Sequence, residues 1–183
     1  MRRVILASVS TLAFLSARTA LSAAGPEKAA GDLLCRLLPD RAAEFVLESI
    51  PAESGRDVFE LESAGGKIVV RGSSGVAIAS GLNWYLKHHG HCHVSWCGDQ
   101  LKLPRPLPSV PQKVRRASPF RYRYCFNYCA FSYTLAFWDW AQWERMIDWM
   151  ALHGINMPLA VTGQEAVWLK IYRELGLSDA EIG

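Results

Sequence analysis

The sequence predicts an α/β fold in two parts: a small amino-terminal α/β domain at residues 25–103, then the first two βα units of an incomplete TIM (β/α)8 barrel at residues 120–183. From Phe120 onward, strand and helix patterns alternate, whereas the small domain has a helix, three strands, a second helix and two short strands. The run 155–161 is almost wholly apolar, which is typical of a strand buried on both faces of a parallel sheet. Four prolines between 104 and 111 indicate a stiff linker, which we place at residues 104–119.

Residues 1–24 have the pattern of a secretory signal peptide. Arg2 and Arg3 precede an apolar stretch from 4 to 15, and small residues follow up to Ala24, after which we expect cleavage. The stretch is shorter than the roughly 20 apolar residues of a membrane-spanning helix, and no later run reaches that length. We therefore expect a chain that enters the secretory pathway and has no membrane span.

Loss of residues 1–24 removes three arginines and no acid, so the formal charge falls from +3 to 0. A near-neutral chain without a basic stripe gives no reason to expect nucleic acid as a partner. The chain contains no GxGxxG, P-loop or HExxH pattern, so we predict no cofactor. The sequence does not specify an oligomeric state.

The segment 88–93 contains histidines and Cys92, and Cys97 follows it, which are residue types that bind zinc. We predict no metal site, because alternate strand residues point to opposite faces and no second ligand pair follows at zinc-site separation. A Cys92–Cys97 disulfide stays open at this point. The five cysteines are an odd number, so at least one has no partner within this sequence.

In the small domain, apolar spacing predicts a helix at 27–38, which Pro39 ends, and a second helix that Ser73 or Ser74 caps and that runs to about 89, before Gly90. Strands are predicted at 45–50, 58–63 and 67–72, the last two joined by a hairpin at 64–66, and at 92–96 and 100–103.

The barrel part begins with a strand from Phe120 and a helix at 140–153, for which Asp139 and Gln142 form a predicted capping box. Trp140, Trp143, Ile147, Met150 and Ala151 share one face of this helix, which predicts packing against the barrel wall. Glu144 and Asp148 lie on the other face, where we expect them to meet solvent. Because a complete barrel takes about 250 residues, we expect the 64 residues from 120 to 183 to begin a longer catalytic domain.

Candidate functional residues follow the two barrel strands, because parallel-barrel sites form at the carboxyl ends of the strands. Asn127 offers a hydrogen-bond donor and an acceptor suited to a sugar hydroxyl, with Cys129 beside it. The alternative is that Asn127 only forms hydrogen bonds within its own loop and that Cys129 is only a small core residue. After the second strand, Gln164 is a candidate polar ligand-binding residue, whereas Glu165 suits the first turn of a helix without any ligand.

The run FNYCAFSYTLAFWDWAQWERMIDWMALHGINMPLAVTGQEAVW closely resembles the start of the catalytic domain of the α-N-acetylglucosaminidases, glycoside hydrolase family 89. The upstream run VRGSSGVAIASGLNWYLKHHGHCHVSW is similar to the small amino-terminal domain of that family. The resemblance extends from about Glu27 to the end of the sequence.

This resemblance implies a retaining exo-hydrolase that removes terminal α-linked N-acetylglucosamine, in animals chiefly from heparan sulfate in the lysosome. It implies that Asn127 and Cys129 contact the sugar, and that the two catalytic glutamates lie on later strands, beyond Gly183. We therefore expect the chain to be inactive alone. Ala130 and Val161 depart from the threonine and aromatic residue common in relatives. The alternative is a short secreted module that binds glycan or protein without catalysis.

Overall fold

The computed structural model describes residues 25–160 and 163–183. The predicted signal peptide and Val161 lie outside these residues. The small domain consists of α1 (Pro26–Leu37), a 3-10 turn (Ala42–Glu44), β1 (Phe45–Ser49), β2 (Val58–Ala64), β3 (Lys67–Gly72) and α2 (Gly75–His88). Its elements agree with the predicted helices, strands and hairpin to within two residues. No helix among the described residues is long and apolar enough to cross a membrane.

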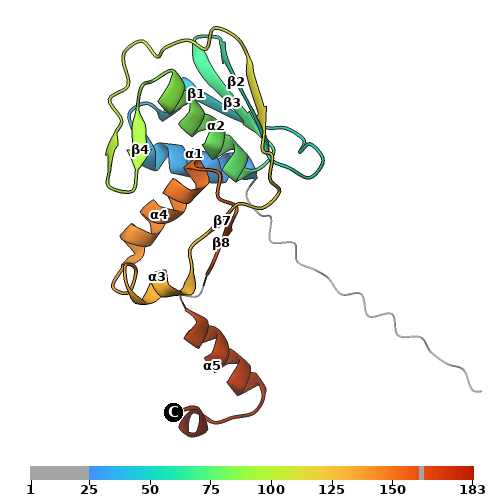
Figure 1. The fold of residues 1–183 in the computed structure, drawn as a ribbon, viewed down its shortest axis with the longest axis vertical. Coiled ribbons are helices and arrows are strands. Elements are labelled where there is room, and N and C mark those ends of the chain that lie inside the picture. Colours follow the sequence, from blue (N-terminus) through green and yellow to red (C-terminus); the bar gives the residue numbers. More distant parts are fainter. Residues whose placement is uncertain (1–24, 161–162) are drawn as a thin grey trace, which may run out of the picture.

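Strands β1, β2 and β3 of the small domain form one mixed sheet with β6 (Val114–Ala117), in the order β1-β3-β2-β6. β1 runs parallel to β3, and β2 pairs antiparallel with β3 through a turn in which Gly65 and Gly66 have positive φ angles of 58° and 75°. Such angles suit glycine, which has no Cβ. Figure 1 shows α1 and α2 together with this sheet in the upper part of the molecule.

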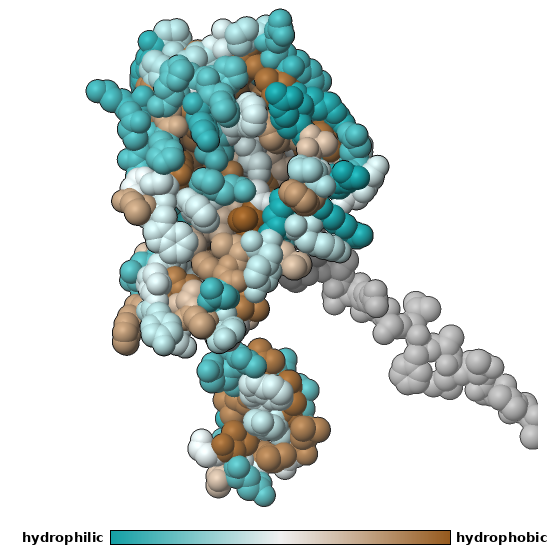
Figure 2. Space-filling view, in the orientation of Figure 1, coloured by the Kyte–Doolittle hydropathy of each residue, from teal (hydrophilic) through white to brown (hydrophobic). Residues whose placement is uncertain are grey.

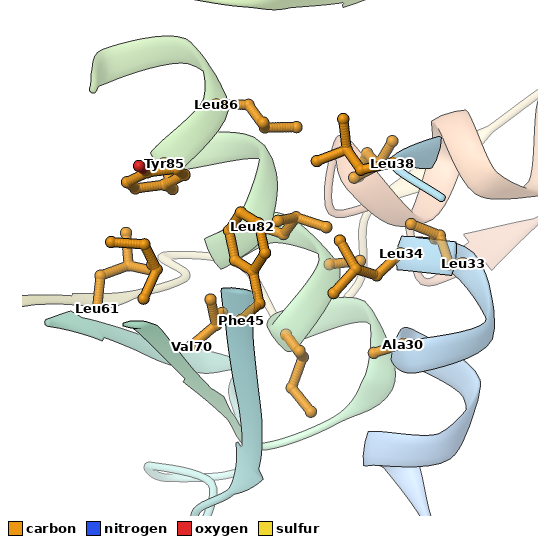
Figure 3. Close-up of a cluster of buried hydrophobic side chains, with 14 of the residues drawn as sticks. Ala30, Leu33, Leu34, Leu38, Phe45, Leu61, Val70, Leu82, Tyr85 and Leu86 are labelled. Atoms are coloured by element: carbon orange, nitrogen blue, oxygen red, sulfur yellow. The ribbon is translucent and has the colours of Figure 1, made fainter. Parts of the chain in front are cut away.

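The core lies between α1, α2 and the sheet, as the close-up in Figure 3 shows. Leu61 and Val70 face each other across β2 and β3 and are fully buried, and the ring of Tyr85 from α2 meets Phe45 edge-on at 5.6 Å between ring centroids. Burial of such side chains gives roughly 1.5–3 kcal/mol each. This apolar layer holds the small domain together.

α2 approaches the sheet closely at Gly81. A methyl group at this position would lie 2.9 Å from Cγ1 of Val70 and 3.3 Å from Cβ of Phe59. The helix therefore needs a glycine here despite the roughly 1 kcal/mol that glycine costs a helix relative to alanine. Ser74 begins the helix, as predicted, and its side chain accepts a hydrogen bond from Ala77 N at 3.0 Å.

The opposite face of the sheet carries charged cross-strand pairs. Arg71 on β3 donates to Glu48 on β1 and to Glu62 on β2, each at 2.5 Å. Glu60 accepts a hydrogen bond from Arg115 at 2.5 Å. The pKa of the Glu60 carboxyl is lowered by the hydrogen bond from Lys113, which contributes most, and by that from Arg115. β2 thus has one apolar face, with Phe59 and Leu61, and one charged face, with Glu60 and Glu62.

Two stretches differ from the prediction. β4 (His93–Ser95) and β5 (Gly98–Gln100) form a separate hairpin, so the strand predicted at 100–103 ends early. β6 (Val114–Ala117) lies within the predicted linker and pairs with β2, its register set by Leu61 opposite Val114. The residues 101–113 before β6 contain no helix or strand. The domain boundaries at 103 and 120 stay a prediction.

The barrel part contains β7 (Tyr124–Cys125), α3 (Tyr128–Ser132), α4 (Trp140–Leu152), β8 (Met157–Pro158), α5 (Gln164–Glu174) and α6 (Asp179–Ile182). β7 and β8 pair in parallel, as the prediction of two βα units requires, but both strands are shorter than predicted. The described residues do not close a barrel. Figure 2 shows hydrophobic side chains gathered around α5, where Val167 of the helix is 59% exposed and Leu175, the residue after it, is 70% exposed.

We predict that Tyr85 links stability to alkaline pH. Burial raises the pKa of its phenol from 10.0 to about 12, and its hydroxyl donates to Pro108 O at 2.8 Å. Because the folded pKa is the higher one, the contribution is complete below pH 10 and is lost as the pH rises towards about 12. Urea unfolding at several pH values should show this loss in the wild type. Tyr85→Phe should lose about 1 kcal/mol at neutral pH and lack that alkaline component; identical alkaline profiles for the two proteins would contradict the assignment.

Candidate functional site

Asn127 lies directly after β7 and begins α3. Its side-chain oxygen accepts a hydrogen bond from Ala130 N at 3.0 Å, which is the geometry of a helix cap. The residue is exposed, and its Nδ2 group donates no hydrogen bond within the described part of the chain. The helix cap therefore uses the side-chain oxygen of Asn127, whereas its amide N–H groups remain available to a ligand.

The residue before it, Phe126, has a φ angle of +76°. A bulky side chain in this region is strained by roughly 1–3 kcal/mol and needs support from its surroundings. The support comes from ring contacts, with centroids of Phe131 and Trp143 at 5.8 Å and 6.4 Å from that of Phe126. The aromatic residues thus fix the backbone turn that sets the direction of Asn127.

Cys129 lies one residue into α3 and is exposed, with a free thiol. All five cysteines are free in the structure, so Cys92 and Cys97 form no disulfide with each other. Gln164 is the first residue of α5 and is exposed. No hydrogen bond among the described residues joins Gln164 to Asn127 or Cys129. The assignment of these three residues to substrate binding stays a prediction.

α4 begins as the sequence predicts. Asp139 and Gln142 form the complete capping box, with Gln142 N donating to Asp139 Oδ1 at 3.0 Å and Asp139 N donating to Gln142 Oε1 at 2.9 Å. The predicted wall face lines an apolar cavity of about 330 Å3 between α4, α3 and the end of β8. That face contributes Trp140, Trp143, Ile147 and Met150.

The prediction that Glu144 and Asp148 face solvent is wrong for Asp148, whose side chain is 17% exposed, whereas that of Glu144 is 38% exposed. Both turn towards α1, where Arg36 donates to Asp148 at 2.6 and 2.8 Å, while Glu144 Oε1 lies 3.9 Å from Arg36 Nε. Arg36 lies 112 residues away in the sequence, so helical spacing gives no sign of the pair. The ion pair of Arg36 with Asp148 attaches α4 to the small domain.

A second group of contacts joins the two parts at the start of β7. The guanidinium of Arg123 donates to the carboxylate of Asp57 and to the backbone oxygens of Gly154 and Phe120. Asp57 also accepts from Ser74 Oγ at 2.8 Å, at the beginning of α2. Arg123 thus ties both barrel strands to the small domain. The sequence analysis missed this residue because its partners are not local.

Six carboxylates of the described residues have shifted pKa values. The pKa values of Glu27, Glu44, Glu60, Asp99, Asp179 and Glu181 are all lowered, chiefly by hydrogen bonds from neighbouring side chains. A general acid of a glycosidase needs the opposite shift. Within residues 25–160 and 163–183, no cluster of three or more histidine, cysteine or acidic side chains has the geometry to hold a metal ion.

Solved structures of glycoside hydrolases share this fold. A family 89 glycoside hydrolase from Clostridium perfringens, in complex with PUGNAc, superposes with a TM-score of 0.79 and 37% sequence identity over 86% of this chain and 18% of that one. A variant of the same enzyme with two glutamates changed to glutamine gives the same values and was solved in complex with its substrate, GlcNAc-α-1,4-galactose.

The family follows from the sequence comparisons. A model described as the alpha-N-acetylglucosaminidase N-terminal domain matches residues 28–109, and one described as the TIM-barrel domain of the same family matches residues 123–183. Human alpha-N-acetylglucosaminidase is 48% identical over 95% of this chain. The chain belongs to the α-N-acetylglucosaminidase family and spans about a quarter of the length of the human relative.

We predict that Arg123 and Asp57 are energetically coupled. Their side chains are 16% and 19% exposed, so Arg123→Met or Asp57→Asn leaves a partly buried partner unpaired and should each lower the free energy of unfolding by about 3 kcal/mol. Chemical denaturation of both single variants and the double variant measures the coupling. Arg173→Met, which removes an exposed ion pair with Asp179, serves as control and should leave stability unchanged. Additive losses would contradict the coupling.

Proposed function

We propose that this chain supplies the amino-terminal domain and part of the substrate pocket of a retaining α-N-acetylglucosaminidase. The substrate class is a glycan with terminal α-linked N-acetylglucosamine, in the degradation of heparan sulfate. The single observation that carries the proposal is the exposed amide of Asn127, directed by a strained backbone at the end of the first barrel strand, in a chain of this family.

In this mechanism the residues of the chain bind and orient the sugar. The Nδ2 group of Asn127 donates to a hydroxyl or acetamido oxygen, while its oxygen remains engaged in the helix cap. Retention of configuration needs two carboxylates roughly 5 Å apart, one as nucleophile and one as acid then base. We assign that pair to the part of the family's barrel outside the matched residues 123–183, and we expect this chain alone to be inactive.

The proposed location is the secretory pathway and the lysosome. This rests on the signal-like residues 1–24 and on the human relative. The pair that joins Asp99 to Arg145 suits an acidic lumen, because the guanidinium holds the pKa of Asp99 below its usual value. The stabilising contribution of this pair is complete above the usual pKa of an aspartate and is lost as the pH falls from that value through the lowered pKa of Asp99.

The proposal predicts that the chain works in an enzyme context. A chimera that joins this chain at Gly183 to the remaining three-quarters of the human relative should hydrolyse a chromogenic α-N-acetylglucosaminide, whereas the chain alone should not. Asn127→Asp in the chimera keeps an oxygen for the helix cap and removes the amide donors. Its kcat/KM should fall roughly tenfold or more, as loss of one charged or polar substrate contact does.

The control is Asn83→Asp, which changes an asparagine of α2 in the small domain. It should leave kcat/KM within roughly twofold of the parent chimera. Hydrolysis by the chain alone at the rate of the human relative would refute the proposal that the catalytic carboxylates lie outside this chain. Equal kcat/KM for the Asn127→Asp variant and the parent would refute the role of the amide. A chain that binds glycan while the folded chimera stays inactive would favour the binding-module alternative.

A further inference from the structure

A hollow of about 200 Å3 lies between the β4–β5 hairpin and α4. It is lined by Ser95, Trp96, Trp138, Gln142, Arg145, Met146 and Trp149. It shares no lining residue with the cavity of about 330 Å3 on the barrel side of α4. This hollow is therefore a separate feature at the junction of the small domain and the barrel part.

Its apolar wall consists of tryptophans that meet at angles. The ring of Trp96 lies 6.1 Å from that of Trp138, tilted by 46°, and 5.7 Å from that of Trp149, nearly perpendicular. Trp96 is nevertheless 47% exposed, so much of its surface remains open to a ligand. Indole rings pack well against the C–H face of a sugar ring and leave its hydroxyls to polar partners.

Its polar wall offers donors. Gln142 uses its oxygen in the capping box, and its Nε2 group donates to nothing else in the described chain. Arg145 uses three N–H groups on Asp99 and Ser95 O, which leaves two of its five free. The indole N–H of Trp149 has no partner among the described residues, but it is buried and therefore closed to a ligand in this structure.

The charge of the hollow selects the ligand. Arg145 is already compensated by Asp99 at 2.6 Å, so an anionic group would gain little from the guanidinium. A neutral ligand with several oxygen acceptors fits the spare donors better. The hollow is also smaller than the roughly 300–1,000 Å3 of drug-sized pockets, which suits one ring rather than a long chain.

We propose that the hollow between the β4–β5 hairpin and α4 is a second carbohydrate site that binds one neutral pyranose unit of a glycan through Trp96, Gln142 and Arg145. The site lies outside the proposed catalytic pocket. It anchors part of a glycan without contributing to bond cleavage, and it does not depend on the proposed function.

The test measures saccharide binding by the purified chain, with N,N′-diacetylchitobiose and maltose as neutral probes and a heparin-derived disaccharide as the anionic probe. Tryptophan fluorescence and ligand-observed NMR report binding. At least one neutral probe should bind with a millimolar or tighter Kd, and the heparin disaccharide should bind more weakly. Binding of the anionic probe alone, or of no neutral probe, overturns the proposal.

Matched variants locate the site. Trp96→Ala should raise the Kd roughly tenfold, whereas Trp168→Ala on α5, equally exposed at 47%, should change it less than about twofold. Gln142→Glu keeps the capping oxygen but replaces two donors, and it should also weaken binding. This variant decides the question if Trp96→Ala unfolds.

A third variant separates this site from the proposed catalytic pocket. Asn127→Ala should leave intact the part of the neutral-probe binding that Trp96→Ala removes. If Asn127→Ala abolishes binding while Trp96→Ala and Gln142→Glu do not, the sugar occupies the pocket at the end of β7 and the second site is refuted. The chimera assay bears only on the catalytic pocket, so the two proposals fail independently.

Discussion

The structure depends on the packing of α2 against the sheet, α1 and the end of α4. One side of this helix lies against β2 and β3, at a separation that only glycine allows at Gly81. The core that α2 shares with the sheet and α1 also includes Leu152, which is 2% exposed and comes from the end of α4. The small domain and α4 of the barrel part therefore share one apolar core, rather than meeting as two separately folded bodies.

Ion pairs then fix the direction of the barrel part against this core. Arg36 binds Asp148 on α4, Arg145 of α4 binds Asp99 in the hairpin, and Arg123 binds Asp57. Charge pairs add less free energy than the apolar core, but their geometry is directional, so they determine how α4 and the two short strands lie. The same ion pairs therefore also fix the position of Asn127, because it follows β7 by only two residues.

Local patterns predicted much of the fold. The extent of α4, its Asp139 cap and the β2–β3 hairpin all depend on residues within a few positions of each other, and the sequence carries those signals. Asn127 is a candidate site residue on the same kind of local signal, its position after a strand, and its role in binding stays a prediction. The family resemblance, which the comparisons confirm, supplied the chemistry that spacing alone could not.

Long-range contacts set the limit of prediction. Asp148 and Arg36 are separated by 112 residues, and Arg123 and Asp57 by 66, so no periodicity relates them. β6 was missed because four residues with two arginines do not resemble a strand until Glu60 of β2 is placed beside Arg115. The sequence does not predict the tryptophan-lined hollow for the same reason, because Trp96 and Trp149 come into contact only when the β4–β5 hairpin packs on α4.

The claim of a shared core is tested most directly by native-state hydrogen exchange of backbone amides. If α2 and α4 unfold together, the amides at the centres of both helices should exchange with the same free energy of opening, and denaturant should lower the two values in parallel. Exchange of α4 through a separate opening of much lower free energy, with α2 still protected, would contradict the account.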